Sequence, residues 1–264
     1  MSEAALAPTL LADKRGLVLG VSSEESVGFH TAKALRAHGA ELAVTGRPSR
    51  AALLTRLADE GYVTTELDAL QPGSIERAVT RVGERFGRLD FLVHTLVHVP
   101  QGALARPVTA LGERELGDAM EVGVRSLLVA AHHAKPWLEK STSPRIVALL
   151  SGGADFAMPS YHVVGIVKAA LGAAVRYLAA ELGPAGILCN AVNFSMLETD
   201  AARREIGEER TARTREHLAK RAMTRAPLGY ADVTRSIAFL ASPLCSNLTG
   251  EAVLVDGGFS RSYF

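Results

Sequence analysis

The chain has few of the residues that mark disulfide-rich, metal-binding or strongly charged proteins. Two cysteines, Cys189 and Cys245, are too few for a disulfide framework or a cysteine metal cluster in 264 residues. The formal net charge is only +1, so no basic excess marks nucleic acid or an anionic membrane as a partner. The N-terminal residues show no basic stretch before a long apolar core, and no apolar run approaches bilayer-spanning length. We therefore expect a cytoplasmic protein that binds no metal, nucleic acid or membrane.

What the chain does have is a series of short apolar runs that alternate with helical patterns. Hydrophobic residues make up 48% and charged residues 22% of the sequence, which is typical of a globular protein with a sizeable core. Runs rich in Val, Leu and Ile predict strands at 16–20, 41–46, 62–68, 89–95, 145–151, 187–193 and 252–258. Helical patterns lie between them at 26–38, 51–60, 74–87, 113–138 and 161–182.

Strands that are apolar throughout and alternate with helices predict a parallel sheet with helices on both faces. We expect an α/β fold of the Rossmann type, with about seven strands in a doubly wound sheet joined by right-handed crossovers. The absence of a repeat or linker predicts a single domain over residues 1–264. The charge-dense stretch 198–221 is either a solvated helical face or part of a substrate lid at about 195–222.

A turn that could bind a nucleotide follows the first strand. The segment "GVSSEESVG", from Gly20 to Gly28, opens directly into a helix, whose first N–H groups and positive dipole end suit a pyrophosphate. Its glycine spacing is wider than the usual dinucleotide fingerprint, and Ser26 stands where a middle glycine would be. The turn alone is therefore equally compatible with an ordinary tight turn.

The end of the second strand bears on the choice of cofactor. Enzymes that use NAD usually place an acidic residue about 20 positions after the glycines, where it binds the ribose 2′-hydroxyl. Here "TGRPSR" offers Arg47 and Arg50 and no carboxylate. Because a guanidinium pairs well with a phosphate, the segment favours NADPH over NADH. The alternative is that both are ordinary surface arginines.

Several segments together resemble the short-chain dehydrogenase/reductase superfamily, in its branch of enoyl-acyl-carrier-protein reductases. They are "GVSSEESVGFHTAKALRAHGAELAVT", "LDFLVHT", "PSYHVVGIVKAALGAAVRYLAAELGPAGILCNAV" and "SNLTGEAVLVDGGFS", and the likeness covers nearly the whole chain. The main branch of the superfamily has a lysine four residues after its tyrosine. Here Gly165 holds that position, and the amine is at Lys168, seven residues after Tyr161. Seven residues span nearly two helical turns, so we expect Tyr161 and Lys168 to share one face of a helix.

The resemblance implies a role for each of these residues. Tyr161 addresses the substrate carbonyl and stabilises the charge that develops on its oxygen, and Lys168 holds the nicotinamide ribose. The cofactor-binding residues that it implies are Gly20, Ser26 and Val27 at the pyrophosphate, Arg47 at the adenosine ribose, Asp68 and Ala69 at the adenine, Thr95 and Leu96 along the trough, and Leu197 and Thr199 beside the nicotinamide. It also implies a homotetramer in which helices 113–138 and 161–182 pack between subunits, although packing within a single chain would leave the same pattern.

The chain departs from the family pattern at positions around the expected nicotinamide pocket. Val97 replaces a glycine and could narrow the cofactor trough. Ser151 replaces a second tyrosine; it either polarises a substrate oxygen, as a serine does in carbonyl reductases of the main branch, or caps the strand end. Ser195 and Met196 replace a glycine–proline pair, so the shape of the pocket should differ.

Two histidines flank the same pocket. His98 and His162 are either proton donors or hydrogen-bonded supporting residues.

Three functions follow from these observations. The first is an NADPH-dependent reductase that transfers hydride to an activated C=C bond of an acyl or natural-product intermediate, either free or bound to a carrier protein. The second, favoured by Ser151, is a ketone or imine reductase of a secondary-metabolite pathway. The third is a non-redox binding or cyclising scaffold in which Val97, Ser195 and Met196 have closed the nicotinamide site.

Overall fold

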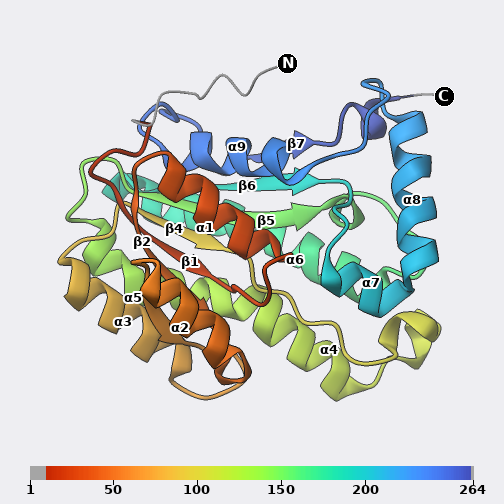
Figure 1. Cartoon of the computed structure of the whole chain (residues 1–264), viewed down its shortest axis with the longest axis horizontal. Helices are drawn as coiled ribbons and strands as arrows, with labels where there is room; N and C mark the ends of the chain where they lie inside the picture. The colour runs from red at the N-terminus through yellow and green to blue at the C-terminus, as the bar shows by residue number, and fades with distance from the viewer. Residues whose placement is uncertain (1–9, 263–264) are drawn as a thin grey trace.

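Seven parallel strands form one sheet at the centre of the protein (Figure 1). The computed structural model describes residues 10–262. The strands are β1 (Arg15–Leu19), β2 (Glu41–Gly46), β3 (Val63–Glu66), β4 (Phe91–His94), β5 (Arg145–Ser151), β6 (Leu188–Phe194) and β7 (Ala252–Val255). Their order is β3-β2-β1-β4-β5-β6-β7, and every neighbouring pair is parallel. The predicted single-domain Rossmann-type α/β fold is confirmed.

Helices cover both faces of the sheet and enclose two apolar cores. One face carries α1 (Val27–Ala37), α2 (Ala51–Asp59) and α9 (Tyr230–Ala241), and the other carries α3 (Ser74–Phe86), α5 (Ser126–Leu138) and α6 (His162–Leu182). Side chains alternate along each strand, so Leu17 and Leu19 of β1 enter the α3/α5/α6 core whereas Val18 enters the opposite core. This alternation explains why the strands are apolar throughout.

The connection from β6 to β7 is the exception to the predicted right-handed crossovers. The step from β5 to β6 runs through α6, whereas the step from β6 to β7 continues in the same direction but runs through α9 on the opposite face. This last connection is therefore left-handed. The handedness rule describes a helix that packs directly back onto the sheet. Here residues 195–229, which include α7 (Asp200–Ile206) and α8 (Glu208–Arg221), first pass beyond the carboxyl edge of the sheet (Figure 1).

Two predicted helices differ in detail from the structure. The segment 113–138 is not continuous: α4 (Glu113–Met120) and α5 are joined by a π-helical turn at Glu121–Arg125. The stretch His162–Ala185, which contains α6, has 24 residues and a mean hydropathy of 1.6, so it is long and apolar enough to cross a membrane by length and composition. The expectation that no such stretch exists is wrong. Half of the apolar window is buried inside the protein, and a single such helix is weak evidence for a membrane span.

Candidate active site

The candidate site lies at the carboxyl ends of β1, β4 and β5, where the order of the strands reverses. β1 pairs with β2 on one side and β4 on the other, which makes a crevice of the kind that binds ligands in open α/β sheets. β5 pairs with β4 only as far as Ala148, whereas it pairs with β6 as far as Ser151. Residues 149–151 therefore leave one edge of β5 unpaired, facing the crevice.

The turn after β1 is closely packed and needs glycine at two positions. Gly20 has φ +103°, and its N–H donates to Thr45 Oγ1 at 3.1 Å. A Cβ on Gly28 would lie 2.6 Å from the Gly20 carbonyl oxygen and 2.8 Å from Thr95 Oγ1. Thr95 in turn donates to the Leu19 carbonyl at 2.7 Å and ties the end of β4 to the turn. This close approach of helix and strand is what the last glycine of a dinucleotide-binding turn provides.

Ser26 is the N-cap of α1, and the turn itself uses its hydroxyl group. Its Oγ accepts from the N–H of Phe29 at 3.2 Å and of Ser22 at 3.3 Å, and donates to the Ser23 carbonyl at 2.7 Å. The Ser26 side chain therefore shapes the turn. For an anion, α1 offers the backbone N–H groups of its first turn, which begins at Val27.

Two carboxylates in this turn are paired with arginines from other segments. Glu24 forms an ion pair with Arg56 of α2, and Glu25 forms one with Arg203 of α7. Because each charge is balanced, the positive end of the α1 dipole is not cancelled by the glutamates beside it. The turn therefore still fits the pyrophosphate of a dinucleotide.

The residues expected at the adenosine end follow β2 and β3, which are neighbours in the sheet. Arg47 is exposed and precedes a 3₁₀ turn at Pro48–Arg50. Asp68 is half-buried and accepts from the N–H of Leu70 at 3.1 Å, and Ala69 is buried. The structure thus brings these residues to the same edge of the sheet as the turn after β1.

Tyr161 and Lys168 converge on the unpaired end of β5. The Tyr161 hydroxyl donates to Ser151 Oγ at 3.0 Å, and Lys168 Nζ donates to the Leu149 carbonyl at 2.5 Å. Tyr161 is the N-cap residue of α6, with φ −135° and ψ 8°, and so stands just outside the helix. The expected shared helical face is therefore not what joins the two groups. They meet because both side chains reach the same short stretch of strand.

The structure explains the glycine at position 165. A Cβ there would lie 2.9 Å from the Gly153 carbonyl oxygen, so the loop after β5 leaves no room for a side chain, and none for a lysine. Gly153 is equally constrained, because its Cβ would lie 2.6 Å from Cδ1 of the Tyr161 ring. The two glycines let the loop lie directly on α6, and the phenol ring lies on that loop.

Burial changes the acid–base properties of both functional groups. It raises the pKa of Tyr161, and the hydrogen bond with Ser151 opposes part of that rise. Burial lowers the pKa of Lys168 to about 8, because the interior disfavours the charged form. At neutral pH the phenol therefore keeps its proton and can donate it, while the lysine is still positively charged.

Two predicted cofactor contacts in segment 195–222, the predicted lid, lie just before and at the N-terminus of α7. Leu197 is buried, and Thr199 is the N-cap of α7, with Oγ1 accepting from the N–H of Ala202 at 3.1 Å. Val97, on the loop after β4, has 43% of its surface exposed, so it is not enclosed by the core.

His98 and His162, which were expected to flank the pocket, are less buried than a third histidine, His94. His162 shares a hydrogen bond of 2.8 Å with the carbonyl of Arg106, and His98 is half-buried. His94, which the sequence did not single out, ends β4 fully buried and bonds to Ser126 Oγ at 2.6 Å. The sequence signal that could have identified His94 was its position at the carboxyl end of a predicted central strand.

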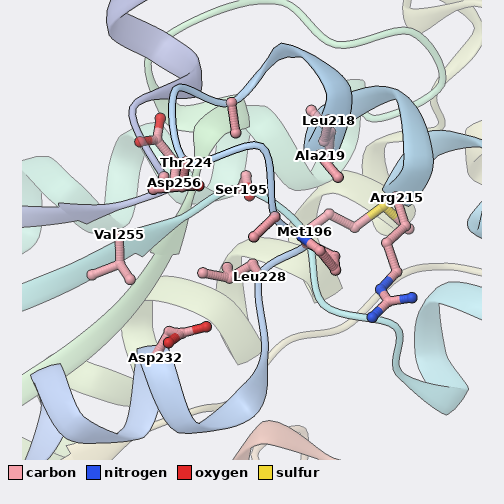
Figure 2. A pocket seen from close by; sticks show the side chains of 14 residues that line it. Ser195, Met196, Arg215, Leu218, Ala219, Thr224, Leu228, Asp232, Val255 and Asp256 are labelled. Carbon is pink, nitrogen blue, oxygen red and sulfur yellow. The ribbon is translucent and has the colours of Figure 1, made fainter. Parts of the chain in front are cut away.

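A cavity of about 320 Å³ lies between α8 and the ends of β6 and β7 (Figure 2). Apolar side chains line much of it, among them Met196 and Leu218 of segment 195–222, Leu228 just before α9, and Val255 at the end of β7. Its wall begins at Ser195, the residue after Phe194, which pairs with Ser151 in the sheet. The cavity therefore adjoins the end of β5 through β6, while Tyr161 itself stands outside its wall.

Known proteins similar to this chain match nearly all of its length. The enoyl-(acyl-carrier-protein) reductase (NADH) FabI of Neisseria meningitidis is 34% identical over 254 residues, covering 95% of this chain and 96% of the relative. The enoyl-(acyl-carrier-protein) reductase (NADH) 1 of Rhizobium meliloti is 33% identical over 264 residues, covering 97% and 93%. The crystal structure of the Aquifex aeolicus enoyl-(acyl-carrier-protein) reductase (NADH) superposes with a TM-score of 0.90 at 30% identity, covering 97% of this chain and 99% of that one.

These relatives correct the predicted cofactor. All of the relatives named above are named as NADH enzymes, and the similar reductase of Anaplasma phagocytophilum, 28% identical, was crystallised with NAD. The preference for NADPH based on Arg47 and Arg50 is wrong. An exposed guanidinium at the end of a strand can stack on an aromatic ring or stay solvated, so its presence does not specify a phosphate partner.

The family assignment rests on sequence and structure together. Residues 20–260 match the family described as enoyl-(acyl carrier protein) reductase. This range includes the turn after β1, the Tyr161–Lys168 pair and segment 195–222. The chain therefore belongs to the enoyl-acyl-carrier-protein reductase branch of the short-chain dehydrogenase/reductase superfamily and is an oxidoreductase.

Proposed function

We propose that this protein uses NADH to reduce the C=C bond of an enoyl thioester carried by an acyl carrier protein. One observation carries the proposal: the Tyr161 phenol and the Lys168 amine both contact the unpaired end of β5, at Ser151 and Leu149. The names of the similar enzymes support the cofactor and the carrier.

The residues around the crevice fit a bound dinucleotide. The first turn of α1 and the glycine-lined turn would hold the pyrophosphate, and Arg47, Asp68 and Ala69 would surround the adenosine end. Thr95 and Leu96 would line the middle, with Leu197 and Thr199 beside the nicotinamide. Lys168 would bind the nicotinamide ribose, because an ammonium group has three hydrogens and Leu149 takes only one. The bound cofactor supplies the hydride.

Tyr161 acts on the substrate oxygen. Addition of hydride to the β-carbon of a conjugated thioester moves negative charge onto the thioester oxygen. The phenol O–H of Tyr161 donates to Ser151 Oγ in the structure. It can rotate to donate to the thioester oxygen instead and so stabilise the negative charge. Ser151 carries a hydroxyl proton of its own, so it is a second donor for the same oxygen. Lys168 contributes a positive charge within the same buried region.

The lid and its cavity would receive the acyl chain. The apolar wall formed by Met196, Leu218 and Leu228 suits a hydrocarbon chain. Arg203 and Arg210 hold the lid to the rest of the site, through Glu25 and through Ser160 Oγ. The lid would thus close over the substrate while remaining attached by exposed contacts. The substitutions at Val97, Ser151 and Met196 favour an acyl or natural-product substrate that differs from that of a housekeeping fatty-acid enzyme.

The Ser151–Tyr161 hydrogen bond also favours a second candidate, reduction of a ketone or imine. Carbonyl reductases of the main branch pair a serine with their tyrosine at the substrate oxygen, and here the two hydroxyl groups are 3.0 Å apart.

Steady-state assays of the purified full chain test the proposal. We expect NADH to be oxidised in the presence of crotonyl thioester and to be stable with acetoacetyl thioester at the same concentration. Oxidation with the ketone substrate alone would favour the second candidate. If millimolar NADH produced no change in protein fluorescence, the crevice would not bind the cofactor and the non-redox scaffold would be supported.

We further propose that the protein is a cytoplasmic homotetramer. Apolar side chains remain exposed along α5 and α6, including Leu128 (41%), Ile166 (42%) and Tyr177 (78%). Large exposed apolar groups on neighbouring helices are typical of subunit interfaces. Sedimentation velocity should show a tetramer for the wild type and smaller species for Ile166→Glu; a monomeric wild type would contradict the proposal.

A further inference from the structure

A buried histidine that the proposed reaction does not use lies next to the β5 end. His94 is the last residue of β4, and both His94 and Ser126, the first residue of α5, have no exposed surface. His94 Nε2 and Ser126 Oγ are 2.6 Å apart, and Ser126 Oγ donates to the Val122 carbonyl at 2.5 Å. The three groups form a short chain of hydrogen bonds inside the protein.

The π-helical turn supplies the last acceptor of this series of hydrogen bonds, the Val122 carbonyl. In an α-helix the N–H of Ser126 would bond to the carbonyl four residues earlier, at Val122. Here it bonds to the Glu121 carbonyl, five residues earlier, and the Val122 carbonyl takes the Ser126 hydroxyl. Such π-turns are frequent at functional sites.

The direction of these bonds fixes which nitrogen of His94 carries the proton. A carbonyl cannot donate, so the single hydroxyl proton of Ser126 goes to Val122. The Ser126 oxygen must then accept from His94, which places the imidazole proton on Nε2 and leaves a lone pair on Nδ1. Burial, and secondly the charge of Lys168, lower the pKa of His94 to about 3, so the ring stays neutral at neutral pH.

Within residues 10–262, the bare Nδ1 has no hydrogen-bond partner and is shielded from solvent. A buried acceptor without a donor is costly, which indicates that a donor reaches it in some state of the protein.

Lys168 is a buried donor in the same region, and its charge acts on the pKa of His94. His94 pairs with Ala148 in the sheet, and the next residue of β5, Leu149, provides the carbonyl that Lys168 contacts. Leu92, two residues before His94, belongs to the core under α3, α5 and α6, so the alternation of the strand turns His94 toward α5 and α6. Lys168 is a buried residue of α6, and this helix contributes Leu171 and Val175 to the same core.

We propose that His94 is a positioning residue for Lys168, with its Nδ1 accepting a second hydrogen of the ammonium group beside the Leu149 carbonyl. The third hydrogen is left for the cofactor ribose. This inference rests on the proposed role of Lys168 in NADH binding. Two acceptors on adjacent strands fix the direction of a long side chain that one acceptor would leave free to swing. Ser126 and the π-turn contribute by holding the imidazole in the required tautomer.

Nitrogen NMR of protein labelled with ¹⁵N-histidine tests the contact without any cofactor. The His94 signals are assigned by their loss in His94→Gln. In the wild type we expect the Nε2 resonance of a protonated nitrogen and the Nδ1 resonance of a hydrogen-bonded acceptor. In Lys168→Met, whose unbranched side chain is nearly as long but has no proton to give, the Nδ1 resonance should move toward that of a free lone pair. An Nδ1 resonance unchanged by Lys168→Met would overturn the proposal.

Two substitutions of His94 test whether the proposed contact with Lys168 contributes to NADH binding. Glutamine can place its amide nitrogen near the Nε2 position and keep the bond to Ser126, whereas asparagine can place its amide oxygen near Nδ1. We expect the Kd for NADH to rise about tenfold in His94→Gln, as for the loss of one hydrogen bond to a charged group, and to rise less in His94→Asn. Equal losses in the two variants, or no loss in His94→Gln, would contradict the proposal. Failure of wild-type protein to bind NADH would instead refute the proposed function, and if the variants do not fold, the Lys168→Met spectrum still decides.

Discussion

The two walls of the crevice are held in different ways. The inner wall, formed by β4, β5 and the start of α6, is buried and held by hydrogen bonds to strand groups, as at Ser151 and Leu149. The outer wall, formed by α7 and α8, is attached by polar contacts at the surface, such as the ion pair of half-buried Arg203 with exposed Glu25 and the hydrogen bond of Arg210 with Ser160. Buried contacts on strands fix geometry, whereas exposed pairs contribute at most about 1 kcal/mol each. We therefore expect the inner wall to serve proton donation and cofactor placement, and the outer wall to serve substrate entry.

The largest effect should come from the inner wall at Tyr161. Tyr161→Phe removes the hydroxyl that we propose donates to the substrate oxygen, and it leaves the ring on Gly153. We expect kcat to fall about 100- to 1000-fold, the usual effect of losing one such donor, with the Kd for NADH unchanged. Steady-state kinetics and fluorescence titration measure the two quantities. A variant with unaltered kcat would remove Tyr161 from the mechanism.

Lys168 should affect cofactor binding more than turnover. Lys168→Ala removes the ammonium group, and we expect the Kd for NADH to rise at least about tenfold, as for a lost charge-assisted hydrogen bond. The Tyr161→Phe variant is the matched control, because it alters the same end of β5 without removing the charge. Equal NADH affinity in Lys168→Ala and the wild type would contradict the assignment.

The pH dependence of NADH binding provides a second test of Lys168. Burial lowers its pKa from 10.5 to about 8, so the folded protein loses this proton at a lower pH than the unfolded chain does. Between these values the unfolded state binds more protons, and the contribution of Lys168 to stability rises with pH. NADH affinity should nevertheless fall as pH rises through about 8, since the neutral amine binds the ribose less strongly. NADH titrations at several pH values should show this fall in the wild type and not in Lys168→Met, which has no amine to lose a proton.

Substitutions of Gly153 and its neighbour Gly152 test how strictly the inner wall fixes the position of the Tyr161 ring. A Cβ on Gly153 would meet the Tyr161 ring at 2.6 Å, whereas one on Gly152 would meet Phe156 at 2.8 Å, a half-exposed side chain that can move away. We expect kcat to fall about tenfold in Gly153→Ala and to change little in Gly152→Ala, because a small displacement of a catalytic group is costly. Similar kinetics in the two variants would show that the loop tolerates the added group.

The smallest effect should come from the outer wall. Arg210→Ala breaks the 3.0 Å contact with Ser160, whose φ of 55° places it in the left-handed region just before Tyr161. Because this contact is exposed, we expect KM for the thioester to rise about two- to threefold with kcat preserved. A loss of kcat as large as that of Tyr161→Phe would mean that the outer wall also fixes the geometry of the phenol.

The sequence was sufficient for the fold and for the main features of the inner wall. The alternation of apolar strands and helices predicts the sheet, and the spacing of Tyr161 and Lys168 indicates the family. Other features depend on contacts between distant segments. The left-handed last connection follows from the path of residues 195–229, and the role of Ser126 depends on a π-turn that has no simple sequence signal.

The cofactor prediction failed for a related reason. Arg47 is a charged residue whose partner is set by the shape of the surrounding surface, which the residue type alone does not define. Helix α9 was also missed, because its apolar positions are interrupted by polar ones such as Thr234, which is buried in the structure.

The position of a deuterium label tests the central claim most directly. Wild-type protein is incubated with NADH deuterated at the transferable position and crotonyl thioester, and the product is examined by NMR. We predict a saturated thioester with deuterium on the β-carbon, and at least about a 100-fold slower appearance of this product in Tyr161→Phe. Deuterium on a carbinol carbon with the alkene intact, or no transfer of label from NADH to any substrate, would contradict it.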